Sequence, residues 1–377
     1  MNLESTKFSS LDFVKEQDES YFELLRLARI SVEPDNNAVD SLAAIKLLNQ
    51  LPVFHKEHKR IIPLLNDKAH ELNIFSELSP ESQKLLMTST QQGIVTELAR
   101  KTQLNQMIAT LSAHNIPLIL LKGAAFAEVL YSADAPRTSN DLDILIQKKH
   151  WEKAVSAIKT VMNYTEKPQP DVFGDLYELS FTPKNKIGAA LDLHSSLTHP
   201  LLFNICEEQL WENSVVHPSF TNEGVRTLSP EHALIHQALH AYKDMNFGKY
   251  NLVDSHEIIS AQSPDIVKTI AIAKKWGASV PLFTLLKNCT EIMGSDINSD
   301  LVKQIKPKII TYKMIKKLLK SRFTQPIKNR KPLRYRVNQI LGQFVFTGSI
   351  VRPVALQKLY IKALVTNDVR KGNQNDK

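Results

Sequence analysis

The chain has 377 residues, a formal net charge of +8, 43% hydrophobic residues and two cysteines. This length predicts two or three domains with ample core, and two cysteines exclude a disulfide scaffold and favour a reducing compartment. The sequence has no run of 18 apolar residues and no basic-then-apolar start, so we expect neither a membrane-spanning helix nor a secretory signal, and a cytoplasmic location.

The first part of the chain has the pattern of successive helices. Apolar residues recur at helical spacing from Tyr21 to His114. The clearest helix begins at Ser79-Pro80-Glu81, a capping residue followed by proline in the first turn, and runs toward Asn115. We therefore expect residues 1–115 to form an N-terminal helical region.

A strand, a glycine turn and a helix follow in close order. The short apolar run from Ile116 to Leu121 predicts a buried strand, and Gly123 follows where residues 124–131 take on helical composition. Free backbone N–H groups and the helix dipole favour an anion at the start of such a helix. Lys122 and Gly123 are therefore candidate phosphate-binding residues.

The next predicted strand, DLDILI, carries two carboxylates. A strand places Asp141 and Asp143 on one face, about 6.6 Å apart, where they can share a divalent ion. A hairpin formed by residues 176–181 and 189–194 would bring a third acid, Asp192, beside them. Mg²⁺ binds carboxylate, water and phosphate oxygens, and two such ions stabilise the attacking and leaving oxygens of an in-line displacement.

The stretches LKG, Tyr131, Pro136-Arg137, DLDILI and LDLH together resemble the largely uncharacterised nucleotidyltransferase family of the DNA-polymerase-β-like superfamily, over about residues 116–259. The resemblance implies a small mixed-sheet palm, Mg²⁺ dependence, and transfer of a nucleoside monophosphate from a nucleoside triphosphate. We expect ATP as donor and a hydroxyl or phosphate of a small molecule, glycan or peptide as acceptor.

The same resemblance assigns roles to residues. The catalytic residues and metal ligands would be Asp141, Asp143 and Asp192, with Asp192 also placed to take the acceptor's proton. The nucleotide-binding residues would be Lys122, Gly123 and Arg137, the last through a forked phosphate contact. Better-studied relatives carry Gly-Ser or Gly-Gly after the first strand, so here the phosphate contact would come from backbone N–H groups and Lys122.

The predicted architecture is α+β, with the palm over residues 116–228 and a second helical region over residues 229–302 that begins at Ser229-Pro230-Glu231. Three histidines, His232, His236 and His240, share one face of its first helix. They lack the HExxH order of a zinc site, so hydrogen-bonded core residues are expected. By the family resemblance, His236 and His240 could instead line the acceptor side of the cleft together with Asp254.

The last region, residues 303–377, is basic, with nineteen Lys and Arg against two acids. Apolar residues recur among these charges at helical spacing. A basic amphipathic helix can dock on an acidic face of its own protein, lie on an anionic membrane surface, or contact nucleic acid. No RNA- or DNA-recognition motif is present, so we do not expect nucleic acid as a partner, and docking or peripheral contact with the inner membrane face remain.

A second functional hypothesis is a non-catalytic protein that retains the palm and binds a nucleotide or an anionic polymer. The three clustered carboxylates favour an enzyme, because carboxylates held together at partly buried positions are costly without a charged ligand to balance them.

Overall fold

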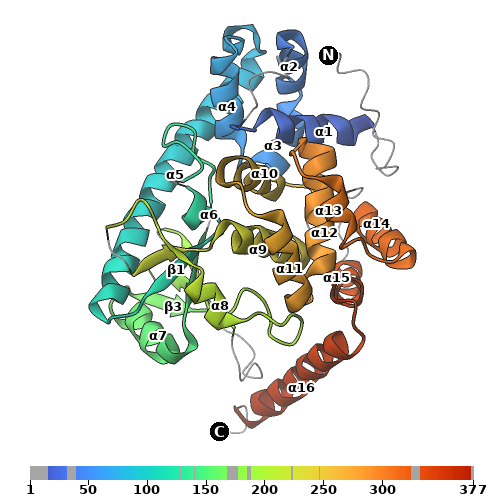
Figure 1. Ribbon diagram of the computed structural model, residues 1–377. Coiled ribbons are helices and arrows are strands. Elements are labelled where there is room, and N and C mark those ends of the chain that lie inside the picture. Colours follow the sequence, from blue (N-terminus) through green and yellow to red (C-terminus); the bar gives the residue numbers. More distant parts are fainter. Residues whose placement is uncertain are drawn as a thin grey trace.

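The computed structural model describes residues 16–31, 40–127, 129–139, 141–167, 177–184, 188–221, 224–245, 247–323 and 332–374 (Figure 1). The longer helices are α1 (Glu16–Leu27), α2 (Ser41–Leu48), α3 (Leu51–His58), α4 (Ile62–Glu71), α5 (Pro80–Ala113), α7 (Trp151–Thr160), α9 (Pro230–Lys243), α10 (Asn251–Gln262), α11 (Ile266–Trp276), α12 (Ser279–Asn288), α14 (Ile309–Phe323), α15 (Pro332–Thr347) and α16 (Val351–Gln374). Short helical segments are η1 (Phe75–Glu77), α6 (Lys122–Phe126), η2 (Lys148–His150), α8 (Glu207–Glu212), η3 (Cys289–Met293) and α13 (Ser299–Lys303).

The strands form one mixed sheet in the order β3-β4-β5-β2-β1-β7-β6. Their bounds are β1 (Leu118–Leu121), β2 (Asp141–Ile146), β3 (Tyr164–Glu166), β4 (Glu178–Pro183), β5 (Ala190–His194), β6 (Val215–Val216) and β7 (Val225–Thr227). The central strand β2 pairs antiparallel with β1 and parallel with β5. The predicted hairpin is confirmed, because β4 and β5 pair antiparallel, although its turn residues 185–187 and the strand residue Leu176 lie outside the described residues.

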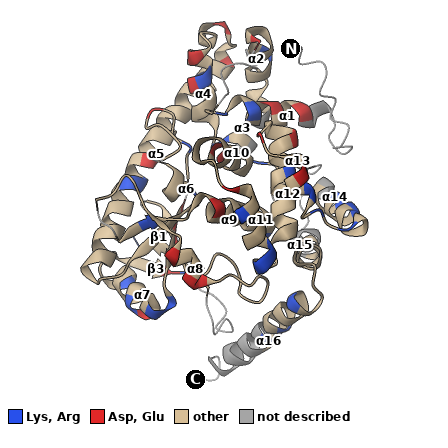
Figure 2. Cartoon of the chain, in the orientation of Figure 1, with Lys and Arg blue, Asp and Glu red and all other residues tan. Residues whose placement is uncertain are grey.

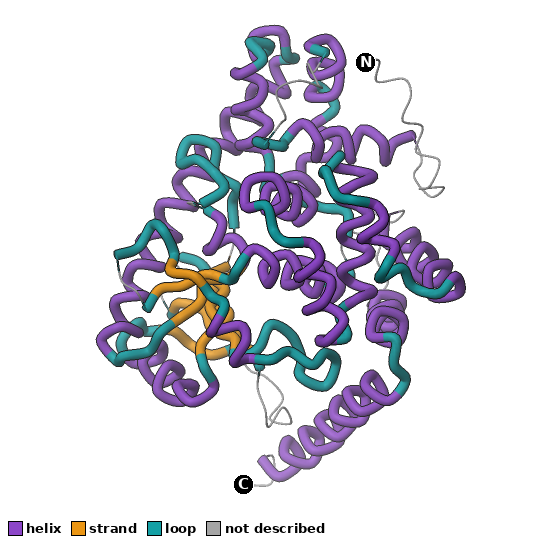
Figure 3. Tube along the Cα trace, viewed as in Figure 1, coloured by secondary structure: helices purple, strands orange, loops and turns teal. Residues whose placement is uncertain are grey.

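The register divides the sheet into a polar and an apolar face. Asp143 is paired with Asp192 of β5, so their side chains project from the same face as Asp141. The alternate residues Leu142, Ile144 and Leu191 are fully buried on the other face, where α5 and α7 lie beside the sheet (Figures 1 and 3). The sequence alternation of β2 thus separates the core from the carboxylates.

The predicted helix after Ser79 is confirmed as α5, a single helix of 34 residues. The Ser79 side chain accepts a hydrogen bond from the Ser82 N–H at 3.3 Å, and a proline occupies the first turn. At 1.5 Å per residue the helix is about 51 Å long, and it runs from the N-terminal helices to the sheet (Figure 1). Ser229 caps α9 in the same way, as its pattern predicted.

The end of α1 is attached to a helix far away in the sequence. Glu257 of α10 accepts hydrogen bonds from the Ser31 N–H and from the Ser31 hydroxyl, the latter at 2.6 Å. Arg29 donates to the Met293 carbonyl at 2.6 Å. The N-terminal helices therefore pack against the second helical region, and the buried residues of both belong to one continuous hydrophobic core.

The C-terminal helices dock on this body along part of their length. Ile315 of α14 is 3% exposed, and the ring of Phe346 in α15 stacks on Phe247 with centroids 5.2 Å apart. These contacts are apolar, so the expected docking of the basic region on an acidic face of the protein stays a prediction. No helix among the described residues is both long and apolar enough to cross a membrane.

The expected fold class, α+β with a mixed sheet among helices, is confirmed (Figure 3). The proposed boundaries after residues 115, 228 and 302 stay predictions. They fall in the segments before β1, after β7 and within α13 respectively, so only the third interrupts an element.

Candidate active site

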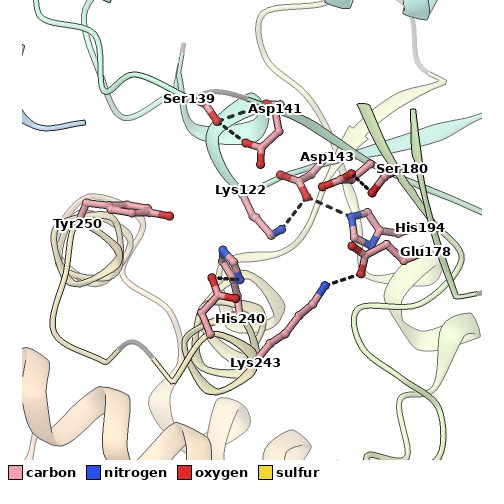
Figure 4. Close-up of polar contacts among 12 residues, drawn as sticks. Lys122, Ser139, Asp141, Asp143, Glu178, Ser180, His194, His240, Lys243 and Tyr250 are labelled. Atoms are coloured by element: carbon pink, nitrogen blue, oxygen red, sulfur yellow. Dashed lines mark hydrogen bonds and ion pairs between the residues drawn. The ribbon is translucent and has the colours of Figure 1, made fainter. Parts of the chain in front are cut away.

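A cleft with about 410 Å³ of empty space, part of it open to solvent, lies where the carboxylate face of the sheet meets α9 and the start of α10. Figure 4 shows side chains of the sheet and of α9 pointing toward one another across it. The lining residues are Arg60, Lys122, Gly123, Arg137, Ser139, Asp141, Asp143, Gln237, His240, Asp244 and Tyr250. Five of the six predicted site residues are therefore brought together, and only Asp192 is not among the lining residues.

The two acids of β2 differ in their surroundings. Asp141 is partly exposed and accepts a hydrogen bond from the Ser139 hydroxyl at 2.9 Å. Asp143 is 2% exposed, and its Oδ1 accepts from Lys122 Nζ at 2.6 Å and contacts His194 Nε2 at 3.1 Å (Figure 4). Asp141 is thus the more open of the two carboxylates, while Asp143 is held in place.

The contacts of Asp143 keep it ionised. Burial by itself would raise the pKa of this carboxyl, but Lys122 and His194 hold the pKa well below its usual range. Burial in turn lowers the pKa of the Lys122 ammonium, and Asp143 more than restores it. His194, in the LDLH stretch, reaches Asp143 because the register pairs it with Leu145, the residue two positions beyond Asp143.

Asp192 lies one strand away from the cleft. It accepts a hydrogen bond from the Ser180 hydroxyl at 2.6 Å, on the paired strand β4. Burial raises the pKa of Asp192, Ser180 opposes that rise, and the nearby charge of Asp143 adds to it. The carboxylate therefore belongs to the same polar face as Asp143 but stands behind it as seen from the cleft.

The turn after β1 differs from the glycine turn that the sequence suggested. Lys122, with φ of 50°, takes the left-handed conformation, which is strained for a residue with a side chain. Gly123 provides space instead: a Cβ there would stand 2.9 Å from Arg137 Nη1 and from the Ser139 side chain. The helix expected over residues 124–131 ends at Phe126 as α6, and Tyr131 lies beyond it.

Arg137 makes a forked contact, and its partner is a carboxylate of the protein. Its Nε and Nη2 donate to Asp254 of α10 at 3.0 and 2.5 Å, and the Tyr131 hydroxyl donates to the same carboxylate at 2.7 Å. Burial lowers the pKa of the guanidinium, but Asp254 raises it above its usual range. Asp254, 0% exposed, thus holds the cleft's walls together, while Arg137 Nη1 remains near Gly123.

The opposite wall is formed by Gln237 and His240 on one face of α9 and by Asp244 just after the helix ends. The acid pattern indicated none of the three. His240 Nδ1 stands 3.7 Å from Asp244 Oδ2. Burial and the Lys122 charge place the pKa of His240 well below 6.5, so its ring is neutral near pH 7. Of the predicted histidines, His240 lines the cleft, whereas His232 stacks on Trp276 in the core.

The donor set suits a hard cation that arrives with a phosphate. Among the described residues, no three side chains of His, Cys, Asp or Glu are arranged to hold a metal ion by themselves. Mg²⁺, however, is commonly bound by one or two carboxylates, with substrate phosphates and waters completing its ligands. Asp141 faces the cleft, and both contacts of Asp143 fall on Oδ1, which leaves Oδ2 for such an ion.

The cleft geometry agrees with a comparison to known families. A family model described as "uncharacterised nucleotidyltransferase" matches residues 56–294, which include every lining residue of the cleft. The match confirms the resemblance seen in the sequence and extends it into the N-terminal helical region. No curated protein matches the chain.

The Arg137–Asp254 pair generates a stability prediction. Replacing Asp254 with Asn leaves a buried guanidinium without its counter-charge, so we expect the free energy of unfolding to fall by about 3 to 5 kcal/mol, measured by urea denaturation. Asp300→Asn, which removes the exposed partner of Lys303, is the control and should change nothing measurable. A loss under about 1 kcal/mol for Asp254→Asn would contradict the structural role given to this pair.

Proposed function

The chain belongs to the uncharacterised nucleotidyltransferase family, and from this premise we propose that its cleft transfers a nucleoside monophosphate from a nucleoside triphosphate, ATP in our proposal, to an acceptor. The acceptor would be a hydroxyl or phosphate oxygen of a small molecule, glycan or peptide. The observation that carries the proposal is the pair Asp141 and Asp143 on one strand face at the cleft, beside the Lys122 ammonium.

We propose Mg²⁺ as the cofactor, held by Asp141 and Asp143 together with the triphosphate. Such an ion offsets phosphate charge and lowers the pKa of an acceptor hydroxyl. The expected metal role of Asp192 stays a prediction. The pairing of Asp192 with Asp143 in the sheet supports this metal role. The hydrogen bond that Asp192 accepts from Ser180 competes with metal binding.

The reaction forms a bond between the acceptor oxygen and the α-phosphorus and breaks the bond to pyrophosphate, so the acceptor's proton needs a base. We propose His240 rather than Asp192 for this step, because His240 lines the cleft and is neutral. Asp244 Oδ2 stands 3.7 Å from Nδ1, so its negative charge would stabilise the imidazolium that forms when His240 takes the proton.

The C-terminal region supports a further element of the proposal, peripheral contact with an anionic membrane surface by a cytoplasmic enzyme. Val351, Val354, Ile361 and Val365 are exposed large hydrophobic residues on α16, and Lys358 and Lys362 lie among them in the sequence. Figure 2 shows basic residues on the described part of this helix. Apolar and basic side chains together are what an interfacial helix presents to anionic lipid.

The first functional prediction concerns the two acids. With water or an added hydroxyl compound as acceptor of the nucleoside monophosphate, Asp141→Asn and Asp143→Asn should each lower Mg²⁺-dependent release of pyrophosphate from ATP by about a hundredfold or more, because each removes a metal-binding charge. Asp134→Asn, an exposed acid in the preceding loop, should leave the rate unchanged. Wild-type turnover in both strand variants would contradict the proposal that these acids bind a metal ion. If the wild type binds ATP without turnover, the non-catalytic alternative is favoured.

The second concerns His240. His240→Gln should lower the pyrophosphate release rate by about a hundredfold or more while ATP affinity stays the same, and added imidazole should restore activity to His240→Ala. Because the folded-state pKa of His240 is depressed, protonation of this ring should not slow the wild type as pH falls from 8 to 6.5. The control is His70→Gln, an exposed histidine. If His240→Gln releases pyrophosphate at the wild-type rate, His240 is not the base and another residue takes the proton.

The third concerns the membrane. Wild-type protein should sediment with vesicles rich in phosphatidylserine at low salt and less so at physiological salt, where the Debye length is about 8 Å. The double variant Lys358→Gln/Lys362→Gln should bind more weakly, and Lys84→Gln/Lys149→Gln, two exposed lysines elsewhere, should bind as the wild type does. Absence of wild-type binding at low salt would refute the membrane contact.

A further inference from the structure

The cations that line the cleft are not equivalent. Lys122 forms an ion pair with Asp143, and Arg137 forms one with Asp254. Arg60 is the third, and within the described part of the chain no carboxylate lies at ion-pair distance from it. Its positive charge is therefore the one that the protein's own acids leave available at the cleft.

Arg60 is held in position without being neutralised. Its Nη1 donates to the Tyr250 hydroxyl at 2.6 Å, and its guanidinium carbon stands 4.4 Å from the centre of the Tyr250 ring. The Arg60 carbonyl accepts from the Thr138 N–H at 3.3 Å, which ties this turn to the loop before β2. A guanidinium has five N–H donors, and the Tyr250 hydroxyl accounts for one.

The origin of Arg60 explains why local sequence patterns do not indicate it. Arg60 lies in the turn between α3 and α4, in the N-terminal helical region. Strand β2, which carries the acids, begins only at Asp141. The family match begins ahead of this turn, at residue 56. The helical region thus contributes a functional group to the cleft.

We propose that Arg60 binds the β- and γ-phosphates of the nucleoside triphosphate, the part that leaves as pyrophosphate. The inference rests on the proposed function, and it assigns a nucleotide-binding role to the N-terminal helices. A nucleoside triphosphate keeps net negative charge even with one divalent ion bound, and a guanidinium fork matches phosphate oxygens in geometry and charge. Tyr250 acts as a positioning residue, since it fixes the fork without consuming the charge.

The test compares ligands that differ only in their phosphates. In the presence of Mg²⁺, titration calorimetry would measure binding of the α,β-methylene analogue of ATP, of AMP and of inorganic tripolyphosphate. Arg60→Gln should lower the affinity for the ATP analogue and for tripolyphosphate by about tenfold or more, in line with the loss of a charged hydrogen bond. Its affinity for AMP should stay within about twofold of the wild-type value. Arg60→Lys keeps the charge and loses the forked geometry, so its affinity for the ATP analogue should lie between those of the wild type and Arg60→Gln.

Lys59→Gln is the matched control, because it removes the same charge from the exposed neighbouring residue and should bind all three ligands as the wild type does. Tyr250→Phe should lower the affinity for the ATP analogue by less than Arg60→Gln does. Equal binding of the ATP analogue by wild type and Arg60→Gln, or equal losses for AMP and the analogue, would overturn the assignment of Arg60.

The two proposals fail separately. If the wild type binds tripolyphosphate through Arg60 but does not bind the ATP analogue, the nucleotide donor is wrong and the polyphosphate contact stands. If it binds the ATP analogue with no contribution from Arg60, the nucleotide donor stands and the contact is wrong. If it binds neither ligand, both proposals are wrong. Unchanged thermal unfolding of Arg60→Gln would show that its effect is on binding.

Discussion

The forked ion pair between Arg137 and Asp254 is the interaction on which the cleft depends. It joins the loop before β2 to helix α10 across 117 positions of sequence, and it also receives the Tyr131 hydroxyl. Two opposite charges this deeply buried are stable only with complete hydrogen bonding, so the pair fixes the spacing of the two walls. The Tyr250 ring packs 4.7 Å from the same guanidinium, and Arg60 is placed through that ring.

Within those walls, Lys122 is paired with Asp143 and Arg137 with Asp254. Lys122 and His194 converge on Asp143 and keep it ionised despite its burial, while Asp141 remains open beside Ser139. The Lys122 ammonium can attract a phosphate, and the neighbouring carboxylate can attract a metal ion. Together they suit a metal–phosphate complex. The backbone of Lys122 is strained at this position, with φ of 50°.

Sequence patterns sufficed for the elements whose signals are local. The apolar runs of β1 and β2, the hairpin of β4 and β5, and the Ser-Pro-Glu starts of α5 and α9 all depend on neighbours a few positions apart. The alternation of DLDILI is enough to place two acids on one face, because a strand has a period of two. The early end of α6 at Phe126 is the main local error. Past that end, the hydroxyl of Tyr131 reaches an acid 123 positions away.

The sequence therefore indicated the local elements and the two strand acids, because side-chain periodicity and capping are encoded within one or two turns, whereas the palm followed from the family resemblance. Which charges neutralise one another depends on the tertiary structure. It paired Arg137 with Asp254 instead of leaving its fork for phosphate, placed Asp192 beside Asp143 but outside the cleft lining, and brought Arg60 to the cleft. It also placed His240 there, which the family resemblance had suggested. Such pairings arise from the packing of distant elements, and electrostatic partners at long sequence separation have no local pattern that could reveal them.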